Sequence, residues 1–222
     1  MGIPVWVRRG RPQAPAVPPP AAVEAPAAHR DGGVAALGWD ELAARVAACT
    51  ACELHRTRTR TVFGTGDREA DWMFVGEAPG ADEDRQGEPF VGRAGQLLTA
   101  MIEALGMRRG QVYIGNVLKC RPPRNRDPRP EEVVRCRPFL ERQIALVRPR
   151  VIVALGRIAA HTLLGVDTPL SRLRGRVHRF GPEGVPVVVT YHPAYLLRSP
   201  GDKRRAWEDL RLARRVAAEG GK

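Results

Sequence analysis

The sequence has no long apolar run. No stretch of 18 apolar residues occurs in its 222 residues, so no membrane-spanning helix is expected. The opening residues, MGIPVWVRRGRPQ, lack the long apolar core of a secretory signal peptide. The sequence therefore predicts a cytoplasmic protein that does not use a membrane.

Acidic residues are outnumbered and lysine is scarce. The chain has 24 Asp plus Glu against 36 Lys plus Arg, nearly all of them arginine, and a formal net charge of +12. Such a charge favours a polyanionic partner, most simply nucleic acid. The alternative is the arginine-rich composition of a GC-rich genome, with arginine in place of lysine on solvated surfaces.

Internal repeats are also lacking, and proline and alanine gather near the start. Residues 11–28, RPQAPAVPPPAAVEAPAA, cannot form a packed core. We therefore expect a disordered Pro/Ala-rich tail over residues 1–38 and one folded domain over residues 39–222.

Apolar runs predict four strands that alternate with helices. The strands are expected at residues 72–76, 112–116, 151–156 and 185–191. Helical patterns occur at residues 39–49, 95–106, 129–147, 156–165 and 200–219. Continuous apolar strands of this kind are typical of an α/β fold with a parallel sheet covered on both faces.

Three turn-rich segments follow predicted strands: GEAPG, VLKCRPP and YHPAYLL. Because ligands of parallel sheets bind beyond the carboxyl ends of the strands, these segments predict one binding site. GEAPG lacks the GK[ST] ending of a phosphate-binding loop, and its glycines and proline suggest a tight turn where the backbone approaches a flat ligand. Taken alone, the motif is more typical of an ordinary turn between a strand and a helix. It also opens an acidic loop, with five carboxylates from Glu77 to Glu88 in an otherwise basic chain.

The chain has only four cysteines. Cys49 and Cys52 form a C-x2-C pair, whereas Cys120 and Cys136 are widely separated by a Pro/Arg-rich loop. Four soft thiolates suit zinc or an iron–sulfur cluster, and zinc ribbons usually have two C-x2-C pairs. The spacing favours a cluster with a structural role; four unrelated buried cysteines are the alternative.

Three long motifs carry a family resemblance. GEAPGADEDRQGEPFVGRAGQLL, NVLKCRPPRNRDPRPEEVVRCRPFL and YHPAYLL, after a C-x2-C pair, closely resemble the iron–sulfur-containing family 4 uracil-DNA glycosylases. The resemblance covers residues 39–212. It implies a three-layer α/β/α fold around a four-stranded parallel sheet, and an enzyme that flips uracil out of DNA and hydrolyses its N-glycosidic bond. It also implies a 4Fe-4S cluster held by Cys49, Cys52, Cys120 and Cys136.

The matching positions carry expected roles. Phe90 matches the residue that stacks on uracil, Asn116 the residue that reads its edge, and His192 the histidine of the HPA motif. The amide of Asn116 can donate to O4 and accept from N3–H, and cytosine inverts both groups. A donor at His192 aimed at O2 would stabilise the charge of the leaving base. The expected uracil-binding residues are Gly76, Glu77, Ala78, Gly80, Glu83, Phe90, Asn116 and His192.

One position departs from the wider pattern. Related family 1 enzymes have an aspartate in the equivalent turn to position water, and Ala78 stands there in this chain. We therefore expect Glu77 to act as the catalytic carboxylate beside His192, and Glu83 to line the C5 side of uracil.

For DNA contacts, Leu196 lies where related enzymes place an apolar wedge that fills the vacated stack. Basic residues beside the site loops are expected to reach phosphates, although each could be merely solvated. These are Lys119, Arg121, Arg124, Arg126, Arg172, Arg174 and Arg198. As partners we expect single- or double-stranded uracil-containing DNA in the nucleoid, a monomeric chain, and a sliding clamp as a candidate contact.

Two other classes stay open. A non-catalytic, metal-stabilised nucleic-acid-binding module would need the cysteines and the basic surface but not Phe90, Asn116 and His192. An electron-transfer protein would need a docking surface more than a base pocket.

Overall fold

The computed structural model describes residues 33–219, so most of the tail predicted for residues 1–38 lies outside the described residues. The end of that predicted tail belongs to the folded domain. Val34, in the short 3-10 helix η1 (Val34–Ala36), is 5% exposed and packs in the core. The Nε atom of Arg142 donates to the carbonyl oxygen of Leu37 at 2.7 Å. The predicted boundary at residue 38 is therefore wrong, since the core already includes Val34.

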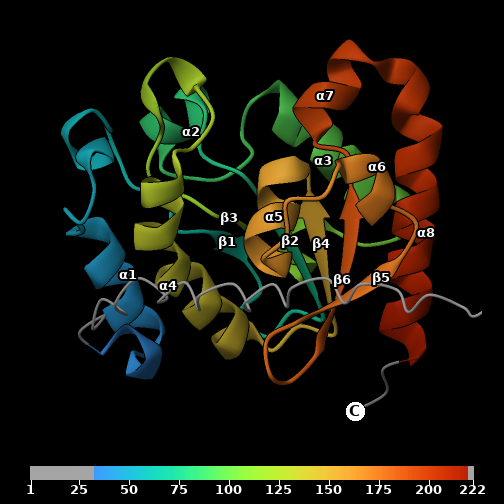
Figure 1. The fold of residues 1–222 in the computed structure, drawn as a ribbon, viewed down its shortest axis with the longest axis horizontal. Helices are drawn as coiled ribbons and strands as arrows, with labels where there is room; N and C mark the ends of the chain where they lie inside the picture. The colour runs from blue at the N-terminus through green and yellow to red at the C-terminus, as the bar shows by residue number, and fades with distance from the viewer. Residues whose placement is uncertain (1–32, 220–222) are drawn as a thin grey trace, which may run out of the picture. The chain divides into compact units, whose positions relative to one another are not determined.

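A mixed sheet with strand order β1-β3-β2-β4-β6-β5 forms the centre of the domain (Figure 1). Its four inner strands, β3, β2, β4 and β6, are parallel, as predicted. Strands β1 and β5 add antiparallel edges, so the sheet has six strands rather than four. The strands are β1 (Thr65–Gly66), β2 (Trp72–Gly76), β3 (Tyr113–Asn116), β4 (Val151–Leu155), β5 (Val177–Phe180) and β6 (Val185–Thr190).

The edge strands leave little trace in the sequence. Strand β1 has two residues, and the residues of β5 alternate between exposed and half-buried, so neither forms an apolar run. The inner strands β2, β3 and β4 are buried along their whole length. Apolar runs therefore predict the inner strands, which are covered on both faces, but not the edge strands β1 and β5.

Five predicted helices are present as α1, α3, α4, α5 and α8, and three short ones were not predicted. Helices α2, α6 and α7 have four to six residues, too few for an amphipathic pattern to be read. The helices are α1 (Trp39–Ala47), α2 (Ala81–Gln86), α3 (Arg93–Ala104), α4 (Pro130–Val147), α5 (Arg157–Leu164), α6 (Leu170–Leu173), α7 (Pro193–Arg198) and α8 (Lys203–Glu219). None of them is long and apolar enough to cross a membrane.

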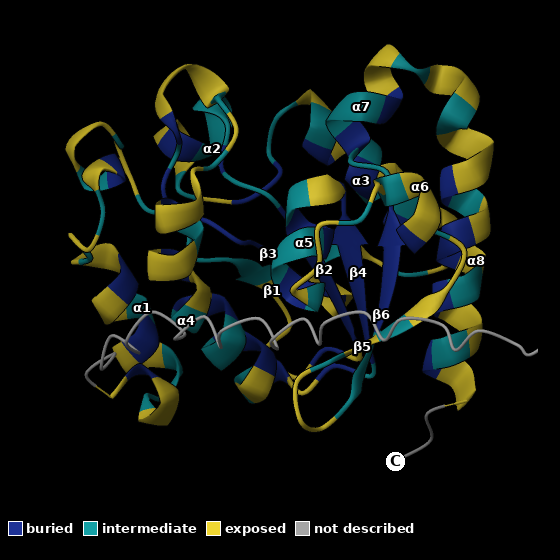
Figure 2. Ribbon diagram, in the orientation of Figure 1, coloured by how far each residue is buried: buried dark blue, intermediate teal, exposed yellow. Residues whose placement is uncertain are grey.

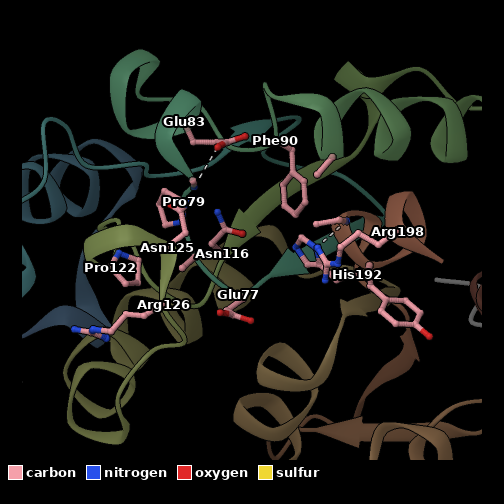
Figure 3. A pocket seen from close by; sticks show the side chains of 15 residues that line it. Glu77, Pro79, Glu83, Phe90, Asn116, Pro122, Asn125, Arg126, His192 and Arg198 are labelled. Atoms are coloured by element: carbon pink, nitrogen blue, oxygen red, sulfur yellow. Dashed lines mark hydrogen bonds between the residues drawn. The ribbon is translucent and has the colours of Figure 1, made fainter. Parts of the chain in front are cut away.

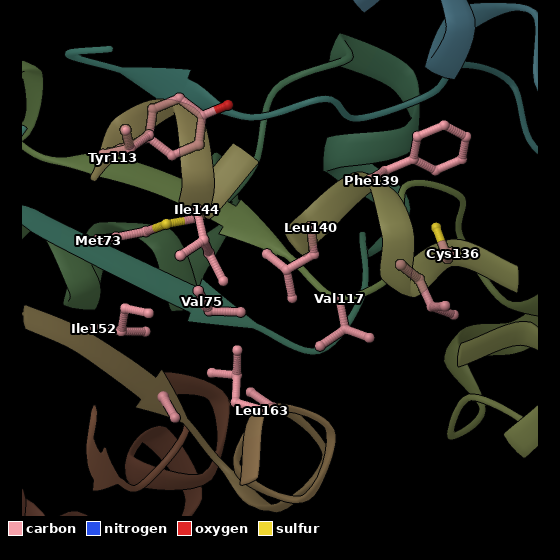
Figure 4. Close-up of a cluster of buried hydrophobic side chains, with 14 of the residues drawn as sticks. Met73, Val75, Tyr113, Val117, Cys136, Phe139, Leu140, Ile144, Ile152 and Leu163 are labelled. Carbon is pink, nitrogen blue, oxygen red and sulfur yellow. The ribbon is translucent and has the colours of Figure 1, made fainter. Parts of the chain in front are cut away.

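Two hydrophobic clusters cover the two faces of the sheet, which confirms a three-layer α/β/α arrangement (Figure 2). Successive residues of β2 point to opposite clusters: Met73 and Val75 to one, Trp72 and Phe74 to the other. The first cluster includes side chains of α1, α4 and α5, part of which Figure 4 shows. The second includes side chains of α3 and α8. Each fully buried aliphatic side chain contributes about 1.5–3 kcal/mol relative to exposure.

The packed sheet brings distant segments to one edge. Gly76, the last residue of β2, is paired with Asn116, the last residue of β3. Beyond them the backbone N–H of Val117 donates to the oxygen of Gly76, and that of Leu118 to the oxygen of Glu77, both at 3.0 Å. These bonds hold the turns after β2 and β3 against each other.

Candidate active site

A pocket of about 430 Å³ opens at the carboxyl edge of the inner strands (Figure 3). This volume is within the range of small-molecule sites. Of the expected uracil-binding residues, all but Gly76 line it. The lining residues are Glu77, Ala78, Pro79, Gly80, Glu83, Phe90, Ala94, Asn116, Pro122, Asn125, Arg126, His192, Ala194, Tyr195 and Arg198.

Asn116, which lines this pocket, has an unsatisfied polar atom in its side chain. Its side chain is 2% exposed, and its Oδ1 atom is buried without a hydrogen-bond partner among the described residues. Leaving such a group unpaired costs about 1–3 kcal/mol. A ligand with an N–H group at this position would recover that free energy.

Gly76 forms the wall behind the pocket. A Cβ atom on this residue would lie 2.6 Å from Cζ of Phe90 and would also collide with Oδ1 of Asn116. Only glycine therefore leaves room for both side chains. Gly76 does not itself line the pocket, and its expected role in uracil binding stays a prediction.

Phe90 is held in an uncommon backbone conformation. Its φ angle is +55°, in the left-handed region, which costs a non-glycine residue about 1–2 kcal/mol. The side chain is 6% exposed, and its ring centroid lies 5.6 Å from that of His192. The carbonyl oxygen of Phe90 occupies the place where a Cβ of Gly95 would be. Gly95 at the start of α3 therefore permits the turn that aims the ring.

His192 is a neutral residue with a defined tautomer. Its Nδ1 atom accepts a hydrogen bond from the backbone N–H of Ala194 at 3.1 Å, at the start of α7. The pKa of His192 is lowered to about 4, mainly by burial and also by the charge of Arg198, while Glu83 acts in the opposite direction. Because Nδ1 acts as an acceptor, the single ring proton is on Nε2, which makes that atom a donor.

Glu77 has a carboxyl group that titrates near neutrality. Burial raises its pKa to about 7, and the negative charge of Asp127 also raises it, while Arg157 acts in the opposite direction. Arg157 and Asp127 form an ion pair at 2.8 Å. Figure 3 shows Glu77 in the same pocket as Asn116 and His192.

The other acids of the loop are largely structural. Glu83 accepts backbone N–H groups from Gly80, Val91 and Gly92, each at 3.1 Å. It lines the pocket as expected, but its carboxylate is engaged in holding the loop around Phe90. Asp84, 3% exposed, accepts the backbone N–H of Thr59 at 2.9 Å. Glu83 and Asp84 therefore hold backbone segments in place, whereas Glu77 lines the pocket.

The four cysteines are brought together, as expected. Cys49, Cys52, Cys120 and Cys136 line one cavity. The Nη1 atom of Arg58 donates to Sγ of Cys120 at 3.1 Å and to the carbonyl oxygen of Cys49 at 2.8 Å. Within residues 33–219 no three His, Cys, Asp or Glu side chains form a group that could itself hold a metal ion.

The expected DNA contacts at Lys119 and Leu196 are wrong. Lys119 is 1% exposed, and its ammonium is bound inside the domain, so it cannot reach a phosphate. Leu196 is 1% exposed, whereas its neighbour Leu197 is 38% exposed. The apolar side chain at the surface of α7 is therefore Leu197.

Two of the expected phosphate contacts have internal partners. Arg174 donates to Asp209 at 2.7 Å and lies 4.0 Å over the ring of Tyr191. Arg126 makes two hydrogen bonds to the buried Glu132, at 2.6 and 2.9 Å. Exposed arginines at the site loops are Arg124, Arg172 and Arg198, and the half-buried Arg121 donates to Asn125.

Sequence reasoning did not assign Pro122, Asn125 and Tyr195 to the pocket. Asn125 and its neighbour Arg124 have φ angles of +55° and +56°, so the loop after Cys120 turns sharply back to the site. The signal available was the segment PPRNR, in which two prolines precede Asn125, a residue type that tolerates left-handed conformations.

Comparisons with known proteins agree with this geometry. The sequence model of the uracil DNA glycosylase superfamily matches residues 63–211. The type-4 uracil-DNA glycosylase of Archaeoglobus fulgidus is 50% identical over 168 residues, which are 72% of this chain and 84% of that protein. The type-4 uracil-DNA glycosylase of Thermotoga maritima is 47% identical over 77% of this chain and 90% of that protein. The type-4 uracil-DNA glycosylase of Sulfurisphaera tokodaii is 43% identical over 80% of this chain and 84% of that protein. This chain therefore belongs to the uracil DNA glycosylase superfamily and, within it, to the type-4 uracil-DNA glycosylases.

Proposed function

We propose that this chain excises uracil from DNA through the pocket around Asn116 and His192. The nucleotide flips out of the stack, its N-glycosidic bond is hydrolysed, and free uracil and an abasic site remain. The observation that carries the proposal is the unpaired Oδ1 of Asn116, in one pocket with the donor Nε2 of neutral His192.

Recognition follows from the atoms that Asn116 presents. Its Oδ1 would accept the N3–H of uracil, and its amide group would donate to O4. Cytosine has an acceptor at N3 and a donor at N4, so both contacts would be lost in a buried site. Mismatches of this kind discriminate by about 10⁴-fold or more. Phe90 would stack on the flipped ring.

His192 would stabilise the leaving base. When the bond between N1 and C1′ breaks, its electron pair leaves with uracil, and negative charge develops on O2. The Nε2–H of a neutral imidazole can donate to that oxygen without first gaining a proton. One preorganised donor of this kind contributes about 3 kcal/mol to the barrier reduction.

Glu77 would act on the sugar side. Its ionised carboxylate would stabilise the positive charge that develops at C1′ and orient the attacking water. The water oxygen bonds to C1′, and the proton it loses is taken up by the carboxylate. With a pKa of about 7, Glu77 is ready for both steps near neutral pH.

The four cysteines would hold a 4Fe-4S cluster. Burial raises the pKa of Cys136 to about 12, so a thiolate there needs a positive partner such as bound iron. Side chains that line one cavity, with N–H donors to two of the sulfurs, suit a cluster of several atoms. When bound, the cluster would supply iron–thiolate bonds that tie the end of α1 to the segment from Cys120 to Cys136.

The DNA backbone would lie over the exposed arginines beside the pocket. Arg124, Arg172 and Arg198 are the strongest candidates for phosphate contacts, because they are exposed. Single- or double-stranded DNA, a monomeric chain and a contact with a sliding clamp remain predictions.

An excision assay tests this function. A labelled oligonucleotide with one uracil is incubated with excess protein and treated with alkali, which cleaves at abasic sites. We expect cleavage at uracil and none in a matched oligonucleotide with cytosine or thymine. DNA binding without excision would instead support the non-catalytic module. A protein that neither bound DNA nor excised uracil would support the electron-transfer alternative.

A further inference from the structure

Lys119 is the least expected buried residue of the domain. Its side chain is 1% exposed, although it stands beside the cysteine motif in a basic chain. Burying an ammonium group is costly unless it is hydrogen-bonded and its charge is compensated. Its contacts therefore indicate why a lysine is present.

The ammonium group of Lys119 lies against the end of strand β3, which precedes it in the chain. Nζ donates to the backbone oxygen of Asn116 at 2.8 Å and to Oε1 of Gln143 at 2.6 Å. A Cβ atom on Gly115 would lie 3.8 Å from Nζ, at ordinary van der Waals distance, so the ammonium packs beside β3. Gln143 is itself held, because its Nε2 donates to the oxygen of Phe63 at 2.8 Å and to the hydroxyl of Tyr113 at 3.0 Å.

The backbone of the same residue contacts the cysteine site. The N–H of Lys119 donates to Sγ of Cys136 at 3.2 Å, and Cys120 follows directly in the chain. Both oxygen acceptors of the ammonium, the backbone oxygen of Asn116 and Oε1 of Gln143, are neutral. One residue therefore contacts a cysteine sulfur with its backbone and Asn116 with its side chain.

We propose that Lys119 is a positioning residue for uracil recognition, which fixes Asn116 and links its position to the state of the cysteine site. This inference rests on the proposed excision and cluster. Cluster loss would free the sulfur of Cys136 that accepts the Lys119 N–H, and this would loosen the bond from the ammonium to the backbone oxygen of Asn116. The amide of Asn116 would then meet the uracil edge with poorer geometry, and a small misplacement of this kind lowers rates strongly.

Matched variants separate this role from general support of the cluster. Lys119→Met removes the ammonium and keeps an apolar stem, while Lys119→Gln keeps an N–H donor without the charge. Arg58→Met is the control, because Arg58 also donates to a cysteine sulfur, while its other hydrogen bonds go to the oxygens of Cys49 and Ala47 rather than to Asn116. Each protein is purified without oxygen, and iron per chain is measured first.

Two further quantities are then measured for each protein. One is the single-turnover excision rate per iron-loaded chain, and the other is the dissociation constant for DNA with a stable abasic site. We expect Lys119→Met to lose about 10–100-fold in rate, the range of a lost hydrogen bond to a charged group, and Lys119→Gln to lose less. Binding to abasic DNA should change less than about threefold, since phosphate contacts dominate it. Arg58→Met should lose iron more readily, with its rate per loaded chain within about threefold of wild type.

The outcomes are distinct. A wild-type rate in loaded Lys119→Met, or an equal loss in loaded Arg58→Met, would overturn the inference. Where Lys119→Met does not fold, Lys119→Gln gives the decision by the same comparison. Wild-type protein without iron would refute the cluster. The excision rates of Lys119→Met and wild type would then still test whether Lys119 positions Asn116. Wild-type protein without excision would refute the proposed function and this inference with it.

Discussion

The backbone N–H of Ala194 donates to Nδ1 of His192 at 3.1 Å, and so fixes the proton of a neutral imidazole on Nε2. The bond lies at the first turn of α7, directly after β6. The fold itself therefore selects the tautomer, and the pocket receives a donor that does not depend on protonation near neutral pH.

His192→Ala should lower the single-turnover excision rate by about 10²–10³, the effect of removing one preorganised oxyanion donor. Binding to uracil-containing DNA should change little, because phosphate contacts dominate affinity. His161→Ala is the matched control, since His161 bonds the oxygen of Thr168 and does not line the pocket. An equal loss in both variants would refute the assignment.

The pH dependence of excision should report Glu77. Its pKa is raised to about 7, so the ionised form is lost as the pH falls through 7, and the rate should fall with it. Glu77→Gln should abolish this acidic limb and cost about 10–100-fold at pH 8, at or below the low end for a positioned acid–base group. The folded state binds this proton more tightly than the unfolded state. The contribution of Glu77 to the free energy of unfolding therefore falls as the pH rises from about 4.5 to 7.

Two measurements check this prediction. Single-turnover rates from pH 5 to 9 give the limb, and denaturant unfolding at pH 5 and 8 gives the stability of both proteins. An unchanged acidic limb in Glu77→Gln would assign the titration to another group. If that variant is slower than His192→Ala at pH 8, the sugar side carries more of the barrier than the leaving base.

Gly76→Ala should close the pocket without unfolding the protein. The added Cβ would lie 2.6 Å from Cζ of Phe90, so the ring must leave its position over the site. We expect a loss of about 100-fold or more in single-turnover excision, comparable with a misplaced substrate. Gly110→Ala is the control, because nothing lies within 4 Å of its Cβ. Normal excision by Gly76→Ala would show that the ring is not needed there.

Cys120→Ser should lose iron and stability together, since ligand loss removes binding free energy that is also folding free energy. Protein purified without oxygen should contain about four irons per chain in the wild type and less in the variant. Thermal unfolding should occur at a lower temperature in the variant. Stoichiometric zinc without iron in the wild-type protein would contradict the cluster.

Leu196 and Leu197 should behave oppositely. Leu196→Ala empties a buried position and should cost about 2–5 kcal/mol of unfolding free energy. Leu197→Ala changes a partly exposed side chain and should leave stability within about 0.5 kcal/mol. Denaturant unfolding measures both. A larger loss in Leu197→Ala would place the buried side chain at the other residue.

The inner strands and the long helices could be predicted, because buried strands and amphipathic helices repeat their pattern over many residues. Asn116 and His192 could be placed because parallel strands end at one edge. The burial of the Lys119 side chain could not be predicted, since a basic residue after a strand is usually solvated. Only the fold shows that its ammonium bonds to the backbone oxygen of Asn116 and to Gln143.

Leu196 illustrates a second limit. Its distance from His192 along the chain was known, but the side of a six-residue helix that faces the core depends on what packs against it. Glu83 is similar, because a carboxylate in a loop gives no sign of the three backbone N–H groups it will accept. Such assignments depend on contacts between segments rather than on any local pattern.

The walls of the pocket come from turns that are far apart in the chain, from Glu77 to Arg198, and meet only where the inner strands end. Excision can therefore serve as a sensor of global folding. Heat-inactivation curves should coincide with optical unfolding curves, because no part of the chain carries enough of the pocket to remain active alone. A protease cut that separates β6 from β2 should abolish excision once the fragments dissociate, and reassociation of the fragments should restore it.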